Sequence, residues 1–139
     1  MTDTTFKYII LEDTYYLALD LSDTIKRLRP CYRLAGIAEE TAEAIRMIIS
    51  EEPDLMIADT SAGDGDSINV LKSKAADIPV IFISEYAMLE KRARSLNMID
   101  FILKPVTSPD LERALNRFDE MKQTRDDSLA DLIPEPNHL

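Results

Sequence analysis

The sequence contains a single cysteine, Cys31, among 139 residues. One cysteine cannot form a disulfide bond within the chain, and this scarcity is typical of proteins kept in a reducing compartment. Cys31 precedes a predicted strand, where we expect it to be a small buried hydrophobic residue. No apolar run reaches the roughly 18 residues that a membrane-spanning helix needs. The start, MTDTTFKYIILED, lacks the basic and apolar parts of a signal peptide. We therefore predict a cytoplasmic protein that does not associate with membranes.

Basic residues are also scarce. Lys and Arg number 16 against 26 Asp and Glu, which gives a formal net charge of −10. Binding to nucleic acids relies on Lys and Arg to replace the counterions of the phosphate backbone. Direct nucleic-acid binding by this chain is therefore not expected. The acidic excess is compatible with a cation site, or simply with solubility.

Two hydrophobic periods alternate along the chain. Hydrophobic residues make up 45% of the sequence, enough for one compact core. Short apolar runs, several of them continuous, predict strands covered on both faces at residues 8–11, 32–37, 55–58, 80–83 and 99–103. Between them, apolar spacings of three and four residues predict helices. Five strands alternating with five helices predict a doubly wound (βα)5 three-layer sandwich, with five parallel strands in the flavodoxin-like topology.

The predicted helices differ in clarity. The fourth, near residues 87–96, is the least clear. The fifth begins at Ser108-Pro109-Asp110, which supplies an N-cap hydroxyl, a proline at the first helical position and an early acid. From about residue 119 the pattern turns polar and could extend this helix, until Pro134 and Pro136 prevent a regular helix from continuing. We assign residues 1–122 to the domain and residues 123–139 to a linker or tail.

The candidate functional residues all follow predicted strands, at the edge where doubly wound sheets bind their ligands. Glu12 and Asp13 follow the first strand, Asp59 the third, Ser84 the fourth and Lys104 the fifth. Three carboxylates at one edge would repel one another. Mg²⁺, which prefers oxygen ligands and keeps several waters, would offset that charge. Asp59 could then accept a phosphoryl group whose oxygens interact with the Lys104 ammonium and the Ser84 hydroxyl.

Each of these residues also has a plain structural interpretation. An Asp after a strand often forms a turn, and a Lys-Pro pair is often a solvated turn. Ser84 could cap the segment that follows it, and Glu12 and Asp13 could be first-turn acids of a helix. Their gathering at one sheet edge, in complementary types, favours a single functional site.

Four segments, IILED, LMIADTSAGDGDS, VIFISEY and DFILKP, occur in the order and at the spacings of the receiver domain of two-component response regulators. Residues 6–121 resemble that family. The resemblance implies that a sensor histidine kinase phosphorylates Asp59. It also implies that Glu12, Asp13, Asp59 and the main-chain carbonyl of Ser61 arrange Mg²⁺. Such a domain is a phosphoryl-accepting signalling unit and not an enzyme, apart from self-phosphorylation from small donors and self-dephosphorylation.

The resemblance also assigns the residues that would respond to phosphorylation. Ser84 matches the switch Ser/Thr, Phe101 the switch aromatic and Lys104 the invariant lysine, and the Lys104–Pro105 bond is expected to be cis. Phe101 stands three residues before Lys104, so the two side chains should lie on opposite faces of the sheet. Motion of Ser84 and Lys104 should act on the face made by the fourth helix, fifth strand and fifth helix. We expect phosphorylation to favour a homodimer through this face.

The sequence departs from the family pattern close to the site. The acid pair is usually two aspartates, and here Glu12 is the first. The Met-Pro-Gly-like stretch after the acceptor, and a later glycine, are replaced by Ala62, Gly63 and Ser67. The AGDGD segment is expected to form a looser loop than usual. Glu85 stands where a small residue is common, and its carboxylate would slow transfer or restrict access.

The segment from Ser84 to Lys104 is short and ends in DFILKPV, which resembles receivers joined to LytTR-type DNA-binding domains. Residues 137–139 resemble the opening of such a DNA-binding domain. This likeness predicts the front part of a transcription regulator; a free-standing receiver with a tail is the alternative. Two other function classes stay open. One is a pseudo-receiver, an interaction module without phosphoryl chemistry. The other is a Mg²⁺-dependent hydrolase, which would usually carry a second Asp where this chain has Ser61.

Overall fold

The centre of the molecule is a five-stranded parallel sheet. The computed structural model describes residues 5–74 and 77–132, with side chains as far as Thr124. The strands lie in the order β2-β1-β3-β6-β7, and each neighbouring pair is parallel. Their bounds are β1 Lys7–Leu11, β2 Arg33–Ala38, β3 Leu55–Asp59, β6 Val80–Ser84 and β7 Met98–Leu103. The predicted doubly wound (βα)5 fold is confirmed.

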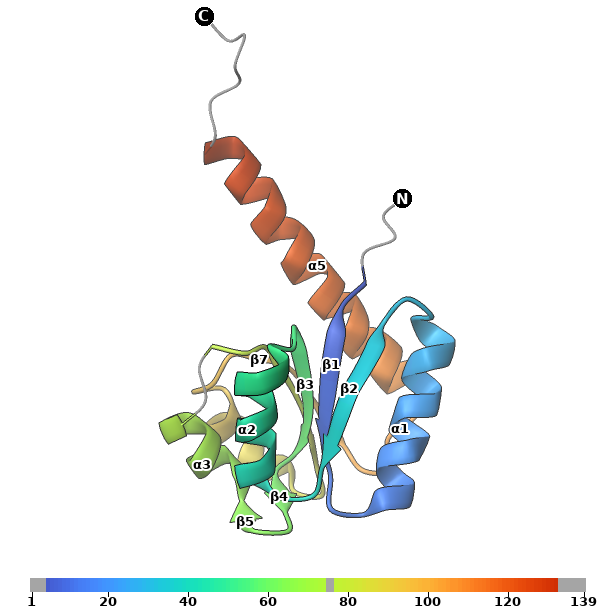
Figure 1. Ribbon diagram of the computed structural model, residues 1–139, viewed down its shortest axis with the longest axis vertical. Coiled ribbons are helices and arrows are strands. Elements are labelled where there is room, and N and C mark those ends of the chain that lie inside the picture. The colour runs from blue at the N-terminus through green and yellow to red at the C-terminus, as the bar shows by residue number, and fades with distance from the viewer. Residues whose placement is uncertain (1–4, 75–76, 133–139) are drawn as a thin grey trace, which may run out of the picture.

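Helices cover both faces of this sheet (Figure 1). One face packs against α1 (Tyr15–Leu28) and α5 (Ser108–Leu132), and the other against α2 (Thr41–Glu51), α3 (Ser67–Lys74), η1 (Ala87–Leu89) and α4 (Glu90–Ala93).

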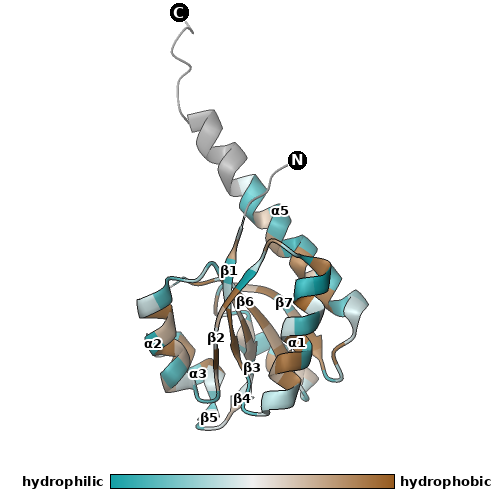
Figure 2. Ribbon diagram, turned by 45° about the vertical axis from the view of Figure 1, so that its right-hand side comes forward, coloured by the Kyte–Doolittle hydropathy of each residue, from teal (hydrophilic) through white to brown (hydrophobic). Residues whose placement is uncertain are grey.

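Successive strand residues point to opposite faces, so Ile10 packs beneath α1 and α5 while Ile9 packs beneath α2 and α3. Strands β3 and β6 are buried along their whole length. Their sequences are therefore continuous apolar runs, and they form the brown centre of the molecule in Figure 2.

The segment after β3 is a hairpin that the sequence did not predict. β4 (Ser61–Ala62) pairs antiparallel with β5 (Gly65–Asp66). Gly65 has a φ of +107°, a conformation that favours glycine. Asp64 accepts hydrogen bonds from two backbone N–H groups at the start of α2, at 2.8 and 3.1 Å, and so caps that helix. Backbone pairing and this cap tie the segment to its neighbours; whether it is looser than the same loop in related domains stays a prediction.

Other parts also differ from expectation. The fourth helix is reduced to η1 and the single turn of α4. Cys31 is exposed, because it lies in the turn before β2 and not in the sheet.

Helix α5 runs past residue 122 without a break and projects beyond the sheet (Figure 1). Where the domain ends stays a prediction, and residues 133–139 lie outside the described residues. Among the described helices, none has both the length and the apolar character needed to cross a membrane.

Candidate functional site

Lys104 joins the acids that end two neighbouring strands. Glu12 follows β1 and Asp59 ends β3; the register pairs Leu11 with Ala58, which sets the two acids next to each other. Lys104 follows β7 and places its Nζ 2.5 Å from Asp59 Oδ2 and 3.2 Å from Glu12 Oε1. One ammonium group therefore bridges both carboxylates.

These charges are largely removed from water. Glu12 and Asp59 are only 2% and 5% exposed. Burial is the main reason that the pKa of Glu12 is raised, and the charge of Asp59 adds to it, while the Thr14 N–H and Lys104 act in the opposite direction. Burial alone would lower the pKa of Lys104, but the hydrogen bonds and charges of Asp59 and Glu12 outweigh it, and the net pKa is raised. Lys104 therefore stays protonated at neutral pH and stabilises the buried acids.

Further donors fix the orientation of Asp59. Its Oδ1 accepts a hydrogen bond from the Ser61 N–H at 2.8 Å, and its main-chain carbonyl accepts one from the Ser67 hydroxyl at 2.6 Å. Ser67 is fully buried at the start of α3. Each carboxylate oxygen of Asp59 thus has one N–H donor, and each can accept a second interaction.

Ser84 ends β6 with its hydroxyl bonded to Thr60 and Tyr86. The Thr60 hydroxyl donates to Ser84 Oγ at 2.7 Å, and the Tyr86 N–H donates to the same oxygen at 3.0 Å. Ser84 in turn donates to the Tyr86 carbonyl at 3.3 Å. Ser84 and Thr60 are both buried. The role of Ser84 as a donor to a phosphoryl oxygen stays a prediction.

The metal site implied by the resemblance has a smaller carboxylate set than expected. In residues 5–74 and 77–132, no group of three or more Asp, Glu, His or Cys side chains is gathered closely enough to hold a metal ion. Glu12 is turned toward Lys104 and Asp13 is exposed. Asp13, Asp59 and the Ser61 carbonyl still form a set of hard oxygen donors, and Mg²⁺ needs only one or two carboxylates because it keeps several waters. The donors fit Mg²⁺, and the site stays a prediction.

Phe101 and Lys104 lie on opposite sides of the sheet. Phe101 is half-buried and packs against the hydrophobic cluster beneath α2 and α3. Lys104 lines a pocket beside α1. The bond between Lys104 and Pro105 is cis. Phe101 is thus placed on the side of the sheet that also carries α4, away from the acids.

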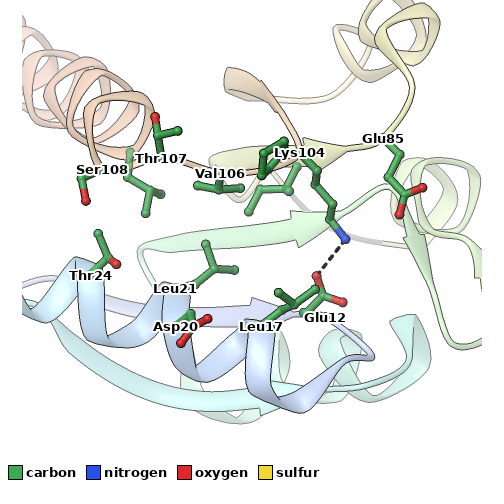
Figure 3. A pocket seen from close by; sticks show the side chains of 13 residues that line it. Glu12, Leu17, Asp20, Leu21, Thr24, Glu85, Lys104, Val106, Thr107 and Ser108 are labelled. Carbon is green, nitrogen blue, oxygen red and sulfur yellow. Dashed lines mark hydrogen bonds and ion pairs between the residues drawn. The ribbon is translucent and has the colours of Figure 1, made fainter.

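A pocket of about 550 Å³ opens beside Lys104 (Figure 3). Leu17 and Leu21 of α1 form one wall, and Val106 and Thr107 of the loop between β7 and α5 form the other. Figure 3 shows the Lys104 ammonium reaching toward Glu12 at one end of this pocket.

Sequence reasoning did not find Thr60 and Ser67. Both are hydroxyl residues that become buried beside Asp59, where one bonds Ser84 and the other the Asp59 carbonyl. The available signal was a second polar residue, Thr60, directly after Asp59 at the end of the third strand. Its partner could not be identified before the register of β3 and β6 was known.

Comparison with known families matches residues 9–116 to the response regulator receiver domain. The chain belongs to this family. Receiver domains are phosphoacceptor signalling domains of two-component systems and not classical enzymes, and they interact with histidine kinases.

The chain is similar in sequence to several known regulators. It is 30% identical over 115 residues to the transcriptional regulatory protein CitB of Klebsiella pneumoniae, covering 79% of this chain and 49% of that protein. It is 20% identical over 122 residues to the sensory transduction protein LytT of Bacillus anthracis, covering 86% and 49%. The receiver therefore spans about half the length of these relatives.

Solved structures show the same fold. The response regulatory domain of protein mrkE from Klebsiella pneumoniae superposes with a TM-score of 0.75 at 21% identity, covering 85% of this chain and 98% of that one. The receiver domain of a LuxO repressor protein from Vibrio parahaemolyticus superposes with a TM-score of 0.75 at 19% identity, covering 88% and 96%.

Proposed function

We propose that this protein acts in the cytoplasm, where Asp59 accepts a phosphoryl group from a sensor histidine kinase with Mg²⁺ bound. One observation carries this proposal: a protonated lysine lies 2.5 Å from a buried carboxylate at the carboxyl edge of the sheet. A structural ion pair has no need of a second acid beside it. Here Glu12 shares the same ammonium, so two acids and one lysine leave an excess negative charge. A bound cation would offset this charge and so permit the approach of an anionic phosphoryl donor.

Each residue of the site has a separate role in the transfer of the phosphoryl group. A carboxylate oxygen of Asp59 attacks phosphorus; the P–N bond to the donor histidine breaks, and its electron pair leaves with the imidazole ring, which takes up a proton. Ser61 N–H and Lys104 hold the carboxylate in place before the reaction. As negative charge accumulates on the phosphoryl oxygens, the Lys104 ammonium can donate a hydrogen bond to one of them, because it carries three donors. Mg²⁺ held by Asp13, Asp59 and the Ser61 carbonyl would offset charge between donor and acceptor.

We further propose that the kinase approaches over α1. The first half of this helix exposes three large apolar side chains close to the acid pair, with Tyr15 58%, Tyr16 68% and Leu19 40% exposed. Other residues of α1, Leu17 and Leu21, line the pocket that opens beside Lys104. Exposed apolar groups beside a polar reaction site are typical of a docking surface.

The output we propose is control of transcription through a LytTR-type DNA-binding domain, switched by a phosphorylation-dependent homodimer. The likeness to LytT supports the first part, and the name of CitB supports transcription more generally. The face of η1, α4, β7 and α5 exposes Met88 (80%), Tyr86 (52%) and Leu103 (47%), which supports an interaction surface there.

The alternative is a pseudo-receiver that binds partners without phosphoryl chemistry. A chain of that kind would not require Lys104 to be held between two buried acids. Intact mass after treatment with acetyl phosphate and Mg²⁺ separates the two. We expect the wild type to gain one phosphoryl mass and Asp59→Asn to gain none. A matched control is Asp64→Asn, which alters a nearby acid that caps α2 and should be phosphorylated normally. Equal gain by Asp59→Asn would show that the acceptor lies elsewhere, and no gain by any protein would favour the pseudo-receiver.

A further inference from the structure

The Ser84 hydroxyl uses all of its hydrogen-bonding capacity within the protein. A hydroxyl has one proton to donate and two lone pairs to accept with. Ser84 donates its proton to the Tyr86 carbonyl and accepts from the Tyr86 N–H and the Thr60 hydroxyl. To donate to a phosphoryl oxygen on Asp59, Ser84 must therefore release its present acceptor.

Thr60 cannot follow Ser84 if that hydroxyl turns away. The Thr60 N–H donates to the Ile83 carbonyl at 3.0 Å, and the Thr60 carbonyl accepts from the Ser67 N–H at 3.2 Å. The Thr60 backbone is thus fixed on one side by β6 and on the other by the start of α3. Its side chain is 2% exposed, so water is not at hand to replace a lost partner.

The two hydroxyl groups also lie on the side of the sheet opposite the reaction. Asp59 points to the face where Lys104 and Glu12 meet it. Thr60 is the next residue, so its side chain points to the other face, and there it meets Ser84. A movement of Ser84 toward a phosphoryl group on Asp59 is therefore a movement away from Thr60.

We propose that Thr60 is a positioning residue that holds Ser84 in its resting place and so sets how readily the receiver enters its phosphorylated conformation. This inference rests on the proposed function. When Ser84 leaves, the buried Thr60 hydroxyl loses its acceptor, and a buried unsatisfied donor is costly. Thr60 contributes to neither attack nor charge stabilisation; it acts only through Ser84.

Replacing Thr60 by Val tests the hydroxyl alone, because Val keeps the branched shape. Without the hydroxyl, nothing is left unpaired when Ser84 moves, and Ser84 has one bond fewer to break. The variant should therefore bind a phosphoryl analogue about tenfold more tightly, the size expected for one buried hydrogen-bond donor. Thr60→Ser keeps the hydroxyl and should bind like the wild type.

The experiment is a beryllofluoride titration in Mg²⁺, followed by the backbone amide NMR signals of position 84 and of Tyr86. It compares wild type, Thr60→Val and Thr60→Ser, each with Ser84 intact and with Ser84→Ala. We expect the tighter binding of Thr60→Val to vanish in the Ser84→Ala background, because the two residues act as one pair. Melting curves identify any variant that does not fold, and Thr60→Ala then takes the place of Thr60→Val.

The outcomes separate this inference from the proposed function. Binding of Thr60→Val that equals or falls below the wild type overturns the role of Thr60, as does a gain that persists in Ser84→Ala. In both cases the wild type still binds beryllofluoride and the proposed function stands. If the wild type does not bind beryllofluoride at any concentration, the proposed function fails and the role of Thr60 fails with it.

Discussion

Lys104 Nζ lies 2.5 Å from Asp59 Oδ2, although the two residues stand 45 positions apart in the chain. Strand β6 separates the strands that carry them, so the lysine side chain crosses the end of β6 to reach the acid. Once there, it also meets Glu12. The removal of this one charge should affect both folding and phosphoryl transfer.

Lys104→Met keeps the length of the side chain and removes its charge. Two neighbouring buried acids then lack a counter-charge, and we expect the free energy of unfolding at pH 7 to fall by about 2 kcal/mol. In a Glu12→Gln background the same change should cost clearly less, because only one acid is left unpaired. Urea denaturation measures both effects. Lys72→Met, which removes an exposed lysine on α3, should change stability by less than about 0.5 kcal/mol. An equal cost in both backgrounds would contradict the shared role of Lys104.

Mg²⁺ should raise the melting temperature of the wild type at millimolar concentrations, because a ligand that binds only the folded state stabilises it. The rise should shrink in Asp13→Ala. Asp20→Ala is a suitable control, since Asp20 is an exposed acid of α1 about two turns beyond the acid pair. Melting curves that do not respond to Mg²⁺, or that respond equally in Asp13→Ala, would argue against the proposed ligand set.

Asp64 should stabilise α2 in a pH-dependent way. Slight burial acts to raise the pKa of Asp64, but the N–H donors of Thr41 and Ala42 outweigh it and the net pKa is lowered from its ordinary 3.8. The stabilising contribution is therefore present above pH 3.8 and is lost as the pH falls through the lowered value. We expect Asp64→Ala to cost about 1 kcal/mol at neutral pH.

The difference between the wild type and Asp64→Ala should close as the pH is lowered further, as measured by urea denaturation across the acid range. Asp64→Asn provides the matched control, because it keeps a capping oxygen but cannot ionise. Its stability relative to Asp64→Ala should not vary with pH. A wild-type advantage that persists unchanged in strong acid would show that the charge of Asp64 is not its source.

Beryllofluoride should convert the protein to a dimer, which light scattering detects as a doubled mass. The charge change Arg94→Glu should weaken this dimer, since Arg94 is exposed beside α4 and pairs only locally, with Glu90, among the described residues. Arg113 is less suitable, because it binds the buried Asp100, and its loss would also affect folding. Arg46→Glu on the exposed side of α2 is the control. A protein that stays monomeric at high concentration, modified or not, would exclude this dimer for the present chain.

The sheet could be predicted because its strands are buried on both faces. Five separate β-rich apolar runs leave few alternatives to a parallel sheet, and the same rule places Asp59 and Lys104 at one edge. An ion pair between Asp59 and Lys104 could be anticipated, since opposite charges at one sheet edge attract. The second contact of Lys104, with Glu12, was not anticipated, because the sequence suggested three acids that need a metal and not two acids joined by an ammonium.

Other features depend on tertiary contacts that leave no periodic signal. Two-residue strands such as β4 and β5 are too short to show a pattern, and their pairing follows from Gly65 and from the cap that Asp64 gives α2. The bond between Thr60 and Ser84 requires the register of two strands to be known first. The short α4 reflects a segment with few buried side chains, of which Ala93 is one.

Helix α5 is packed against the sheet at its start and extends beyond the sheet at its far end. It is anchored to the sheet by its first turns, where Leu111, Leu115 and Phe118 are buried, and it begins four residues after Lys104. Its 25 residues correspond to a rod of about 37 Å at 1.5 Å per residue. The 14 residues after Phe118 extend about 21 Å beyond the buried part, so a tilt of about 5° at Phe118 would displace the far end by roughly 2 Å. A tilt transmitted from Lys104 to this helix would therefore move its far end more than its buried start.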